Sequence, residues 1–348
     1  MTSIVTSAPA KIILCGDHGV NRRQPALCTA VDMRTTCRAK TRSDQHFTLR
    51  SGERFETCSR DRLFAFKADV DRLRETGQLD AIREMARDFF APTRYVLAHV
   101  IEQVGGPGLD IEWFSDVPIS SGLGSGAAAS TAMALAAFHL AGYQPTPDDV
   151  IFVAWQGDII AHGGIASSLD SSTIALGGLV RYTVEDGAQP LAIQKALPLV
   201  VGQAFVEDRS TAKLNTIVRK YLEAHPAKMH LFGDMGWLSN QIEKELSNHD
   251  LFSLGHLFNL HQLIQDKIGT SAPENDALIE AAIGAGALGA KISGAGGGGI
   301  IIALAAPDDQ AGVVAAINEA GGRGLPVTTG APGIRVESGR SGDRQQPA

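Results

Sequence analysis

The sequence predicts a two-domain protein of the α+β class. The chain has 348 residues, a length that suits two domains or one large one. Short apolar stretches typical of strands and longer stretches typical of helices occur in both halves of the chain. The character of the sequence changes around residues 187–190 (Gly-Ala-Gln-Pro). We therefore expect an N-terminal domain at 1–190, a C-terminal domain at 191–336 and a polar, disordered tail at 337–348.

Composition and charge exclude several classes of protein. Hydrophobic residues make up 44% and charged residues 20% of the chain, as in soluble globular proteins. The net charge of −7 gives no electrostatic reason to expect a nucleic-acid partner. No run of about 18 apolar residues predicts a membrane span. Lys11 and Asp17 interrupt the first apolar run, so it is no signal peptide, and we expect a cytoplasmic protein.

The four cysteines all lie in the first sixth of the chain, and none belongs to a pair or cluster with zinc spacing. We expect them to be small buried residues in a reducing compartment.

The first predicted strand, residues 8–16, ends at a glycine and carries Lys11 inside an apolar run. A lysine in such a place either reaches the surface along its stem or serves a site. Asp17 and His18 follow at the end of the strand, where functional sites commonly lie. Lys11, Asp17 and His18 are therefore candidate site residues.

Two further segments precede the central loop. Residues 34–59 alternate in polarity and have a Ser-Gly turn at 51–52, which predicts a hairpin of the same sheet. Residues 65–105 are predicted to be helical, with Pro92 breaking them into two pieces.

A glycine-rich loop, residues 118–130, separates a predicted strand at 109–113 from a predicted helix at 128–140. Glycines allow the backbone to approach a ligand, and the free N–H groups of a helix N-terminus attract anions. The loop lacks the Lys-Ser/Thr pair of a Walker A motif and the third glycine of the dinucleotide fingerprint. It therefore predicts a phosphate site of another kind, or a tight turn packed by small residues.

A second helix is predicted at 150–161, with Thr146-Pro147-Asp148-Asp149 capping its start. Asp158 and His162 are four residues apart, so they lie on one face of this helix. A loop of small polar residues at 163–172 follows and contains one acid, Asp170. From its position alone, Asp170 either caps the next turn or acts in catalysis.

The second half of the chain begins with predicted strands at 177–182 and 199–205. Two or three helices are predicted between residues 234 and 284. A second glycine-rich loop at 287–299 leads into a buried strand at 300–304.

Three blocks, residues 8–20, 118–130 and 291–299, thus stand in a fixed order along nearly the whole chain. Together they resemble the GHMP kinases, the superfamily of galactokinase, homoserine kinase, mevalonate kinase and phosphomevalonate kinase. Within it the details resemble the mevalonate kinases. The matching segments are the first block, an acid-(x3)-His-Gly pattern at 158–163, Ser-Leu-Asp at 168–170, Arg-Ser-Thr at 209–211 and residues 286–296. The signature that opens a galactokinase is missing.

The resemblance implies the two-domain GHMP kinase fold. Its N-terminal domain is similar to ribosomal protein S5 domain 2, its C-terminal domain is a ferredoxin-like sandwich, and the active site lies between them. It also implies ATP-dependent phosphorylation of mevalonate at its C5 hydroxyl, in isoprenoid precursor synthesis. The expected cofactors are ATP and Mg²⁺, the expected partner is mevalonate, and a homodimer is the candidate assembly.

The resemblance assigns roles to individual residues. Asp170 matches the catalytic aspartate that takes the proton of the acceptor hydroxyl, and Lys11 the lysine beside it. Asp158 matches the acid that binds Mg²⁺, with Ser125 as a second ligand. The expected ATP-binding residues are Pro118, Ser120, Ser121, Gly122, Leu123, Gly124, Ser125, Gly126 and Ala127. The expected acceptor-binding residues are Asp17, His18, Thr211, Gly294 and Ala295.

The sequence also departs from the family pattern. Gly126 stands where a second serine is usual, and Asp17 and Asp158 are each one methylene shorter than the usual glutamate. Residues 21–24 (Asn-Arg-Arg-Gln) replace a Val-Tyr-Gly-x segment. The loop before Asp170 is one residue longer, with Ser168 in place of glycine.

These departures touch the sites of both substrates and leave two alternatives open. One is another small-molecule kinase of the superfamily: a mevalonate 3-kinase, a phosphomevalonate enzyme or a homoserine kinase. The other is a nucleotide-binding pseudoenzyme that keeps the fold for regulation.

Overall fold

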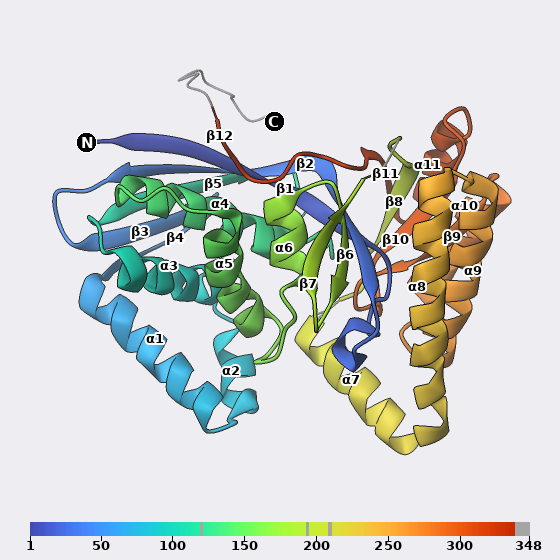
Figure 1. Ribbon diagram of the computed structural model, residues 1–348, viewed down its shortest axis with the longest axis horizontal. Coiled ribbons are helices and arrows are strands. Elements are labelled where there is room, and N and C mark those ends of the chain that lie inside the picture. Colours follow the sequence, from blue (N-terminus) through green and yellow to red (C-terminus); the bar gives the residue numbers. More distant parts are fainter. Residues whose placement is uncertain (119–120, 193–194, 208–210, 338–348) are drawn as a thin grey trace.

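The computed structural model describes residues 1–118, 121–192, 195–207 and 211–337 of the chain. These form two sheets with helices packed around them (Figure 1). Of the predicted tail at 337–348, residues 338–348 lie outside the described residues, and Glu337 accepts a hydrogen bond from the Ser7 hydroxyl. No helix in the described ranges is long and apolar enough to cross a membrane.

The larger sheet has eight strands, in the order β12-β1-β2-β5-β3-β4, with β6 pairing with β2 and β7 with β6. Its strands are β1 (Ser3–Cys15), β2 (Ala26–Thr41), β3 (His46–Ser51), β4 (Arg54–Ser59), β5 (Leu109–Ser115), β6 (Leu179–Thr183), β7 (Gly187–Leu191) and β12 (Arg335–Val336). The pairing of β3 with β4 confirms the predicted hairpin.

Helices cover one face of the larger sheet (Figure 1). They are α1 (Arg60–Glu75), α2 (Leu79–Met85), α3 (Ala91–Val104), α4 (Ser125–Leu140), α5 (Pro147–Ala161) and α6 (Leu169–Leu176). Helix α4 consists mostly of small residues, so it can pack closely on β1 and β2 while α3 and α5 flank it. Thr146 and Asp149 form the capping box that starts α5, as predicted.

The smaller sheet is antiparallel, in the order β11-β8-β10-β9. Its strands are β8 (Pro198–Ala204), β9 (Gly289–Ser293), β10 (Gly299–Leu304) and β11 (Arg323–Thr328). The helices of this part are α7 (Thr211–Ala224), α8 (Leu231–Asn248), α9 (Leu251–Lys267), α10 (Pro273–Gly284) and α11 (Gln310–Glu319). This strand order, with helices after the first and third strands, is that of a ferredoxin-like sandwich.

The two sheets share a buried apolar core. Ala10, Ile12 and Leu14 of β1 belong to one cluster with Leu199 of β8 and Phe258 of α9. The C-terminal half of β1 is therefore buried on both faces, which explains why it reads as a continuous apolar run.

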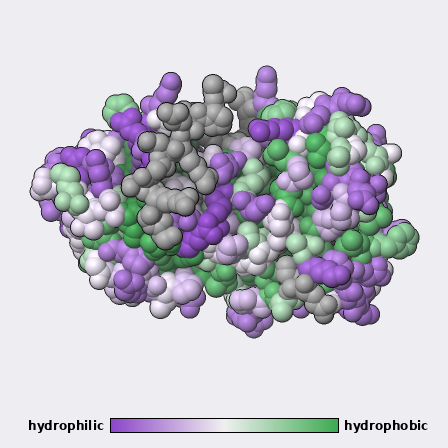
Figure 2. Space-filling view, turned by 90° about the horizontal axis from the view of Figure 1, so that it is seen from above, coloured by the Kyte–Doolittle hydropathy of each residue, from purple (hydrophilic) through white to green (hydrophobic). Residues whose placement is uncertain are grey.

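On the face in Figure 2, hydrophilic and hydrophobic residues are interspersed.

Three expectations about local structure were wrong. Residues 60–104 form three helices, because the chain also turns at Gly77 (φ 67°), and Pro92 lies in the first turn of α3, a position that proline tolerates. Asp170 lies in the first turn of α6, where the sequence indicated a loop. Residues 289–293 of the second glycine-rich segment form β9, because this strand pairs with β10.

The residues at the predicted domain limits, 190 and 336, both lie in strands of the larger sheet. Strand β7 contains Pro190 and pairs with β6, and β12 returns from the far end of the chain to pair with β1. The domain limits at 190 and 336 stay predictions.

Arg23 is one of two non-glycine residues with positive φ among the described residues, and it ends a short 3₁₀ helix, Val20–Arg22. Its φ of 61° and ψ of 22° are left-handed values that favour glycine. The resemblance described above implies a glycine at this position.

We expect Arg23→Gly to stabilise the protein by about 0.5 to 1 kcal/mol, because the left-handed conformation strains a side chain. Urea unfolding measures the change in the free energy of unfolding, and the dependence of that free energy on urea concentration should be unchanged. The control is Arg62→Gly in the exposed first turn of α1, which should destabilise by about 1 kcal/mol. A destabilised Arg23→Gly variant would contradict the expectation.

Candidate active site

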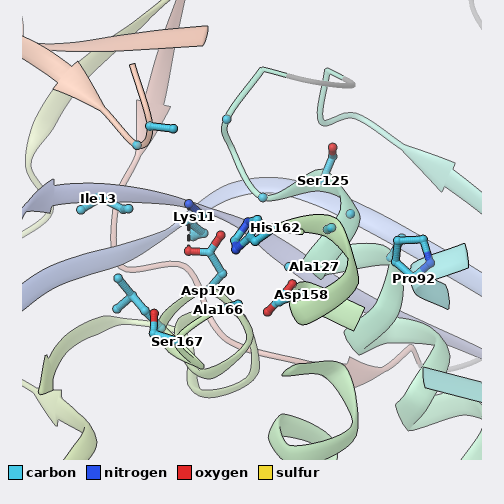
Figure 3. Close-up of a pocket in the computed structure, with 18 of the residues that line it drawn as sticks. Lys11, Ile13, Pro92, Ser125, Ala127, Asp158, His162, Ala166, Ser167 and Asp170 are labelled. Carbon is cyan, nitrogen blue, oxygen red and sulfur yellow. Dashed lines mark ion pairs between the residues drawn. The ribbon is translucent and has the colours of Figure 1, made fainter. Parts of the chain in front are cut away.

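A cavity of about 440 Å³ lies between β1, the start of α4, the helices α5 and α6 and the loop after β9. Figure 3 shows Lys11, Asp158, His162 and Asp170 close together in it, with Ile13 toward one side and Pro92 toward the other. The chain thus brings three of its candidate residues, one from each of three separate segments, to one place.

The Lys11–Asp170 ion pair is the centre of this group. The Lys11 Nζ lies 3.0 Å from Asp170 Oδ1, and the two side chains are 5% and 16% exposed. Burial is the largest influence and lowers the pKa of Lys11, but the charge and hydrogen bond of Asp170 and the other nearby groups together outweigh it and leave that pKa above its ordinary value. Lys11 is therefore an ammonium ion at neutral pH.

Backbone contacts between β1 and the glycine loop fix the position of Lys11. The Lys11 N–H donates to the carbonyl of Leu123 at 2.9 Å. Gly124 precedes α4 with a φ of 79°, and a Cβ there would stand 3.0 Å from Lys11 Cγ. Glycine is required at 124 both by its conformation and by the lysine stem against it.

Asp158 projects into the cavity from the last turn of α5 and is buried. Its Oδ2 accepts no hydrogen bond from the described residues. Burial and the nearby charge of Asp170 raise the pKa of Asp158 well above its usual value. A buried carboxylate oxygen without a partner is costly, so this atom suits a bound cation.

The site fits Mg²⁺ only as an ion that is shared with a substrate. Among the described residues, no group of three or more histidines, cysteines or acids could hold a metal by itself. Mg²⁺ typically takes one or two protein ligands together with phosphate oxygens and water. Asp158 meets this requirement, and Ser125, which lines the same cavity, is available as a second ligand.

The predicted phosphate loop divides into two groups. Gly122, Gly124, Ser125, Gly126 and Ala127 line the cavity at the start of α4. Three others support the loop: Leu123 packs into the core, and the Ser121 hydroxyl donates to the carbonyl of Pro118 at 2.8 Å. Ser120 lies outside the described residues.

Gly126 is exposed, and a Cβ built on it would meet nothing within 4 Å. The glycine is therefore not required by packing. A side chain here would extend into open space at the helix N-terminus.

The predicted acceptor residues lie at the other side of the cavity, where the two sheets meet. His18 Nε2 is 2.9 Å from the carbonyl oxygen of Ala295, and burial lowers the pKa of His18. His18, Gly294 and Ala295 line the cavity together. Thr211 begins α7, and its side chain lies outside the described residues.

Asp17 lines the same cavity, but its carboxylate is bonded within the protein. Its Oδ2 lies 2.9 Å from Lys291 Nζ, and its Oδ1 accepts the N–H of Gly294 at 2.5 Å. Both oxygens are thus bonded to the protein.

Some cavity residues were given no role by the sequence analysis. His162, whose spacing of four places it on the same helix face as Asp158, lines the cavity beside Asp170. Phe90 and Trp113 form a stacked pair with ring centroids 6.3 Å apart and line the side toward Pro92. They come from separate segments without a motif, so no sequence signal connects them.

The arrangement combines an ammonium–carboxylate pair, a second carboxylate with a free oxygen and a helix N-terminus facing one cavity. These groups can hold phosphates, accept a proton from a hydroxyl and neutralise negative charge, which are the requirements of phosphoryl transfer.

Comparisons with known proteins agree with this chemistry. The family model described as GHMP kinases N terminal domain matches residues 92–178, and that of GHMP kinases C terminal matches residues 242–323. The chain is 32% identical to the mevalonate kinase of Thermococcus sibiricus over 96% of its length and 98% of the relative. It is 29% identical to the mevalonate kinase of Pyrococcus horikoshii, with the same coverage.

Solved structures share the fold. The Methanococcus jannaschii mevalonate kinase superposes with a TM-score of 0.77 at 19% identity, over 94% of this chain and 98% of that one. The L. major mevalonate kinase in complex with R-mevalonate gives 0.73 at 23% identity, over 94% and 96%. The expected two-domain fold is thereby confirmed. By sequence and by fold, the chain belongs to the GHMP kinases and, within them, to the mevalonate kinase family.

Proposed function

We propose that this kinase transfers the γ-phosphoryl group of ATP to the C5 hydroxyl of (R)-mevalonate, a step of isoprenoid precursor synthesis. The observation that carries the proposal is the Lys11–Asp170 pair, which lies between the start of α4 and the acceptor residues. ATP and a small-molecule acceptor follow from the family. The acceptor's identity and the phosphorylated oxygen are the parts that need a test.

In the proposed reaction Asp170 accepts the proton of the acceptor hydroxyl as its oxygen attacks the γ-phosphorus. Lys11, paired with Asp170, shares the negative charge that develops on the transferred group. The free N–H groups at the start of α4 bind the phosphates of ATP. Positioning and neutralisation, with no covalent intermediate, are what phosphoryl transfer needs.

Asp158 and Ser125 would hold Mg²⁺ when it enters with ATP. The ion would neutralise charge on the phosphates, and the raised pKa of the buried Asp158 is what a cation-seeking carboxylate would have before the ion arrives. The magnesium requirement stays a prediction, as do the homodimer and the cytoplasmic location.

The two sides of the cavity suit the two substrates. The stacked rings of Phe90 and Trp113 provide an apolar surface for a flat nucleobase. His18, Gly294 and Ala295 provide an imidazole and backbone groups for the polar acceptor. The intact Lys11–Asp170 pair argues against a pseudoenzyme, because a protein that only binds nucleotide needs no base beside the acceptor.

We expect Asp170→Asn to fold normally and to bind ATP with nearly unchanged affinity, because the change keeps the shape of the side chain. Turnover should fall by about 10²-fold or more, the usual effect of losing a general base. Steady-state kinetics and calorimetry measure both quantities, with Asp308→Asn on an exposed turn as the control. Near-normal turnover of the Asp170 variant would refute its assignment as the base.

Mevalonate should be the preferred acceptor in a panel with phosphomevalonate, homoserine and galactose, followed by ADP release. Phosphorus NMR of the product should locate the phosphate on the primary C5 oxygen. The physical reason is that His18 and the loop after β9 form the acceptor side of the cavity. A small acceptor bound there would place its reacting hydroxyl next to Asp170. Phosphate on C3, or turnover of a phosphorylated acceptor only, would favour one of the alternative kinases.

Gly126→Ser and Gly126→Val test the phosphate loop. Since a Cβ at 126 meets nothing, both variants should fold. The serine variant should change mainly the Mg·ATP dependence, by at most about tenfold, because water can take the place of a hydroxyl on Mg²⁺. The valine variant should fail to bind ATP, because its branched side chain obstructs the approach of the phosphates to the backbone.

ATP titration of both variants by calorimetry, with and without Mg²⁺, measures these effects. Normal ATP binding by Gly126→Val would mean that this loop does not hold phosphate.

A further inference from the structure

A second ion pair lies beneath the acceptor side of the cavity. Asp17 follows the end of β1, and Lys291 lies in the middle of β9 of the smaller sheet. The Lys291 Nζ is 2.9 Å from Asp17 Oδ2, and both side chains are 0% exposed. Burying an ion pair away from water costs desolvation free energy, so a buried pair at this position suggests a specific role.

The donors of Lys291 are all used within the protein. Besides Asp17, its ammonium group donates to the carbonyl oxygens of Ile13, at 3.5 Å, and of Ile292. One side chain of the smaller sheet thus binds β1 at two points, through a carbonyl within the strand and a carboxylate just beyond its end.

His261 of α9 is the third ionisable group here, with its Nε2 at 3.7 Å from Asp17 Oδ2. This nitrogen accepts the N–H of Gly16 at 3.1 Å, so it carries no proton. Burial, and then the charge of Lys291, lower the pKa of His261 to about 3. His261 is therefore neutral at pH 7, and Lys291 is the counter-charge of Asp17.

Asp17 is held as an anion by these contacts. Burial by itself raises the pKa of Asp17, but Lys291, foremost among its neighbours, brings that pKa below the ordinary value. Its Oδ1 accepts the N–H of Gly294 at 2.5 Å. With one oxygen on Lys291 and the other on Gly294, the carboxylate is oriented by the protein before any ligand arrives.

Further bonds join the same two segments. The Ser293 hydroxyl is 2.9 Å from both the N–H and the carbonyl oxygen of Ile13. His18 Nε2 is 2.9 Å from the carbonyl oxygen of Ala295. The segment 13–18 and the segment 291–295 are therefore bonded together along their length, and the ion pair is the charged and most buried part of this contact.

We propose that Asp17 and Lys291 are positioning residues, a buried charge pair that sets the acceptor-binding groups His18, Gly294 and Ala295, and that neither side chain touches the acceptor. This rests on the proposed function, and it replaces the expectation that Asp17 binds the substrate.

The proposal predicts strong coupling between the two residues. Removing one charge leaves the other buried and uncompensated, which displaces the segment or destabilises the protein. Replacing both by neutral side chains of similar shape removes the charge imbalance and keeps the packing. A carboxylate that binds the acceptor directly would show no such rescue, because the contact would be lost in both cases.

The experiment compares the wild type with Asp17→Asn, Lys291→Met and the double variant. Each single variant should raise the KM for mevalonate by about tenfold or more, with kcat and the Kd of ATP within about threefold of wild type. The double variant should return the KM to within about threefold of wild type. A positioning role at the acceptor side predicts a rise in the KM for mevalonate alone. A general loss of structure would also lower kcat and weaken ATP binding.

The matched control is Arg181→Met. Arg181 of β6 and Glu243 of α8 form another ion pair between the larger sheet and the smaller part, at 2.5 Å and away from the cavity. This variant should leave the KM unchanged. An equal rise in KM for it would overturn the proposal, because any loosened contact between the two parts would then have the effect.

Unchanged KM in folded single variants, or a double variant as impaired as Asp17→Asn, would also overturn the proposal. If the variants do not fold, a crystal structure of the wild type with mevalonate decides. No Asp17 oxygen within 3.5 Å of the ligand supports the proposal, and a direct contact refutes it. A wild type without activity on mevalonate would instead refute the proposed function, since that measurement precedes the variants.

Discussion

The contact between β1 and the glycine loop is the constraint on which the rest of the site depends. One residue, Lys11, uses its backbone to hold the loop through Leu123 and its side chain to hold Asp170. The stem of that lysine passes close to Gly124, where a side chain would collide. Helix α4 and Asp170, for which phosphate binding and catalysis are proposed, are thereby both held in place by the same strand. Their separation is set by a rigid, doubly buried element rather than by loops.

Much of this could be predicted from the sequence because the information was local. The glycine loop, the capping box at Thr146 and the buried strand around Lys11 each follow from neighbouring residues. The pairing of Lys11 with Asp170 needed the resemblance, because no spacing rule links residues so far apart. The stacking of Phe90 on Trp113 could not be predicted either, because these residues are also far apart in the sequence.

The prediction that Asp17 binds the acceptor shows what residue type and position leave undecided. A carboxylate next to a candidate histidine at the end of a strand suggests a ligand, and the sequence holds no sign of the lysine that neutralises it. Lys291 lies in a segment that looks like a glycine loop, and only its pairing with β10 makes it a strand residue pointing into the core. Burial of a charge depends on tertiary structure, so residue type and position alone could not distinguish a substrate contact from an internal ion pair.

The return of β12 to β1 has a consequence for how the protein is made. The Ser7 hydroxyl bonds the carboxylate of Glu337, 330 positions away, and Arg34 donates to the carbonyls of Pro332 and Gly333. During synthesis on the ribosome, which proceeds from the N-terminus, β1 therefore remains an open sheet edge until almost all of the described chain has emerged. Such non-local pairing slows folding. The edge that stays open is the stretch of β1 around Thr6 and Ser7, and an unpaired strand edge is a place where nascent chains can aggregate.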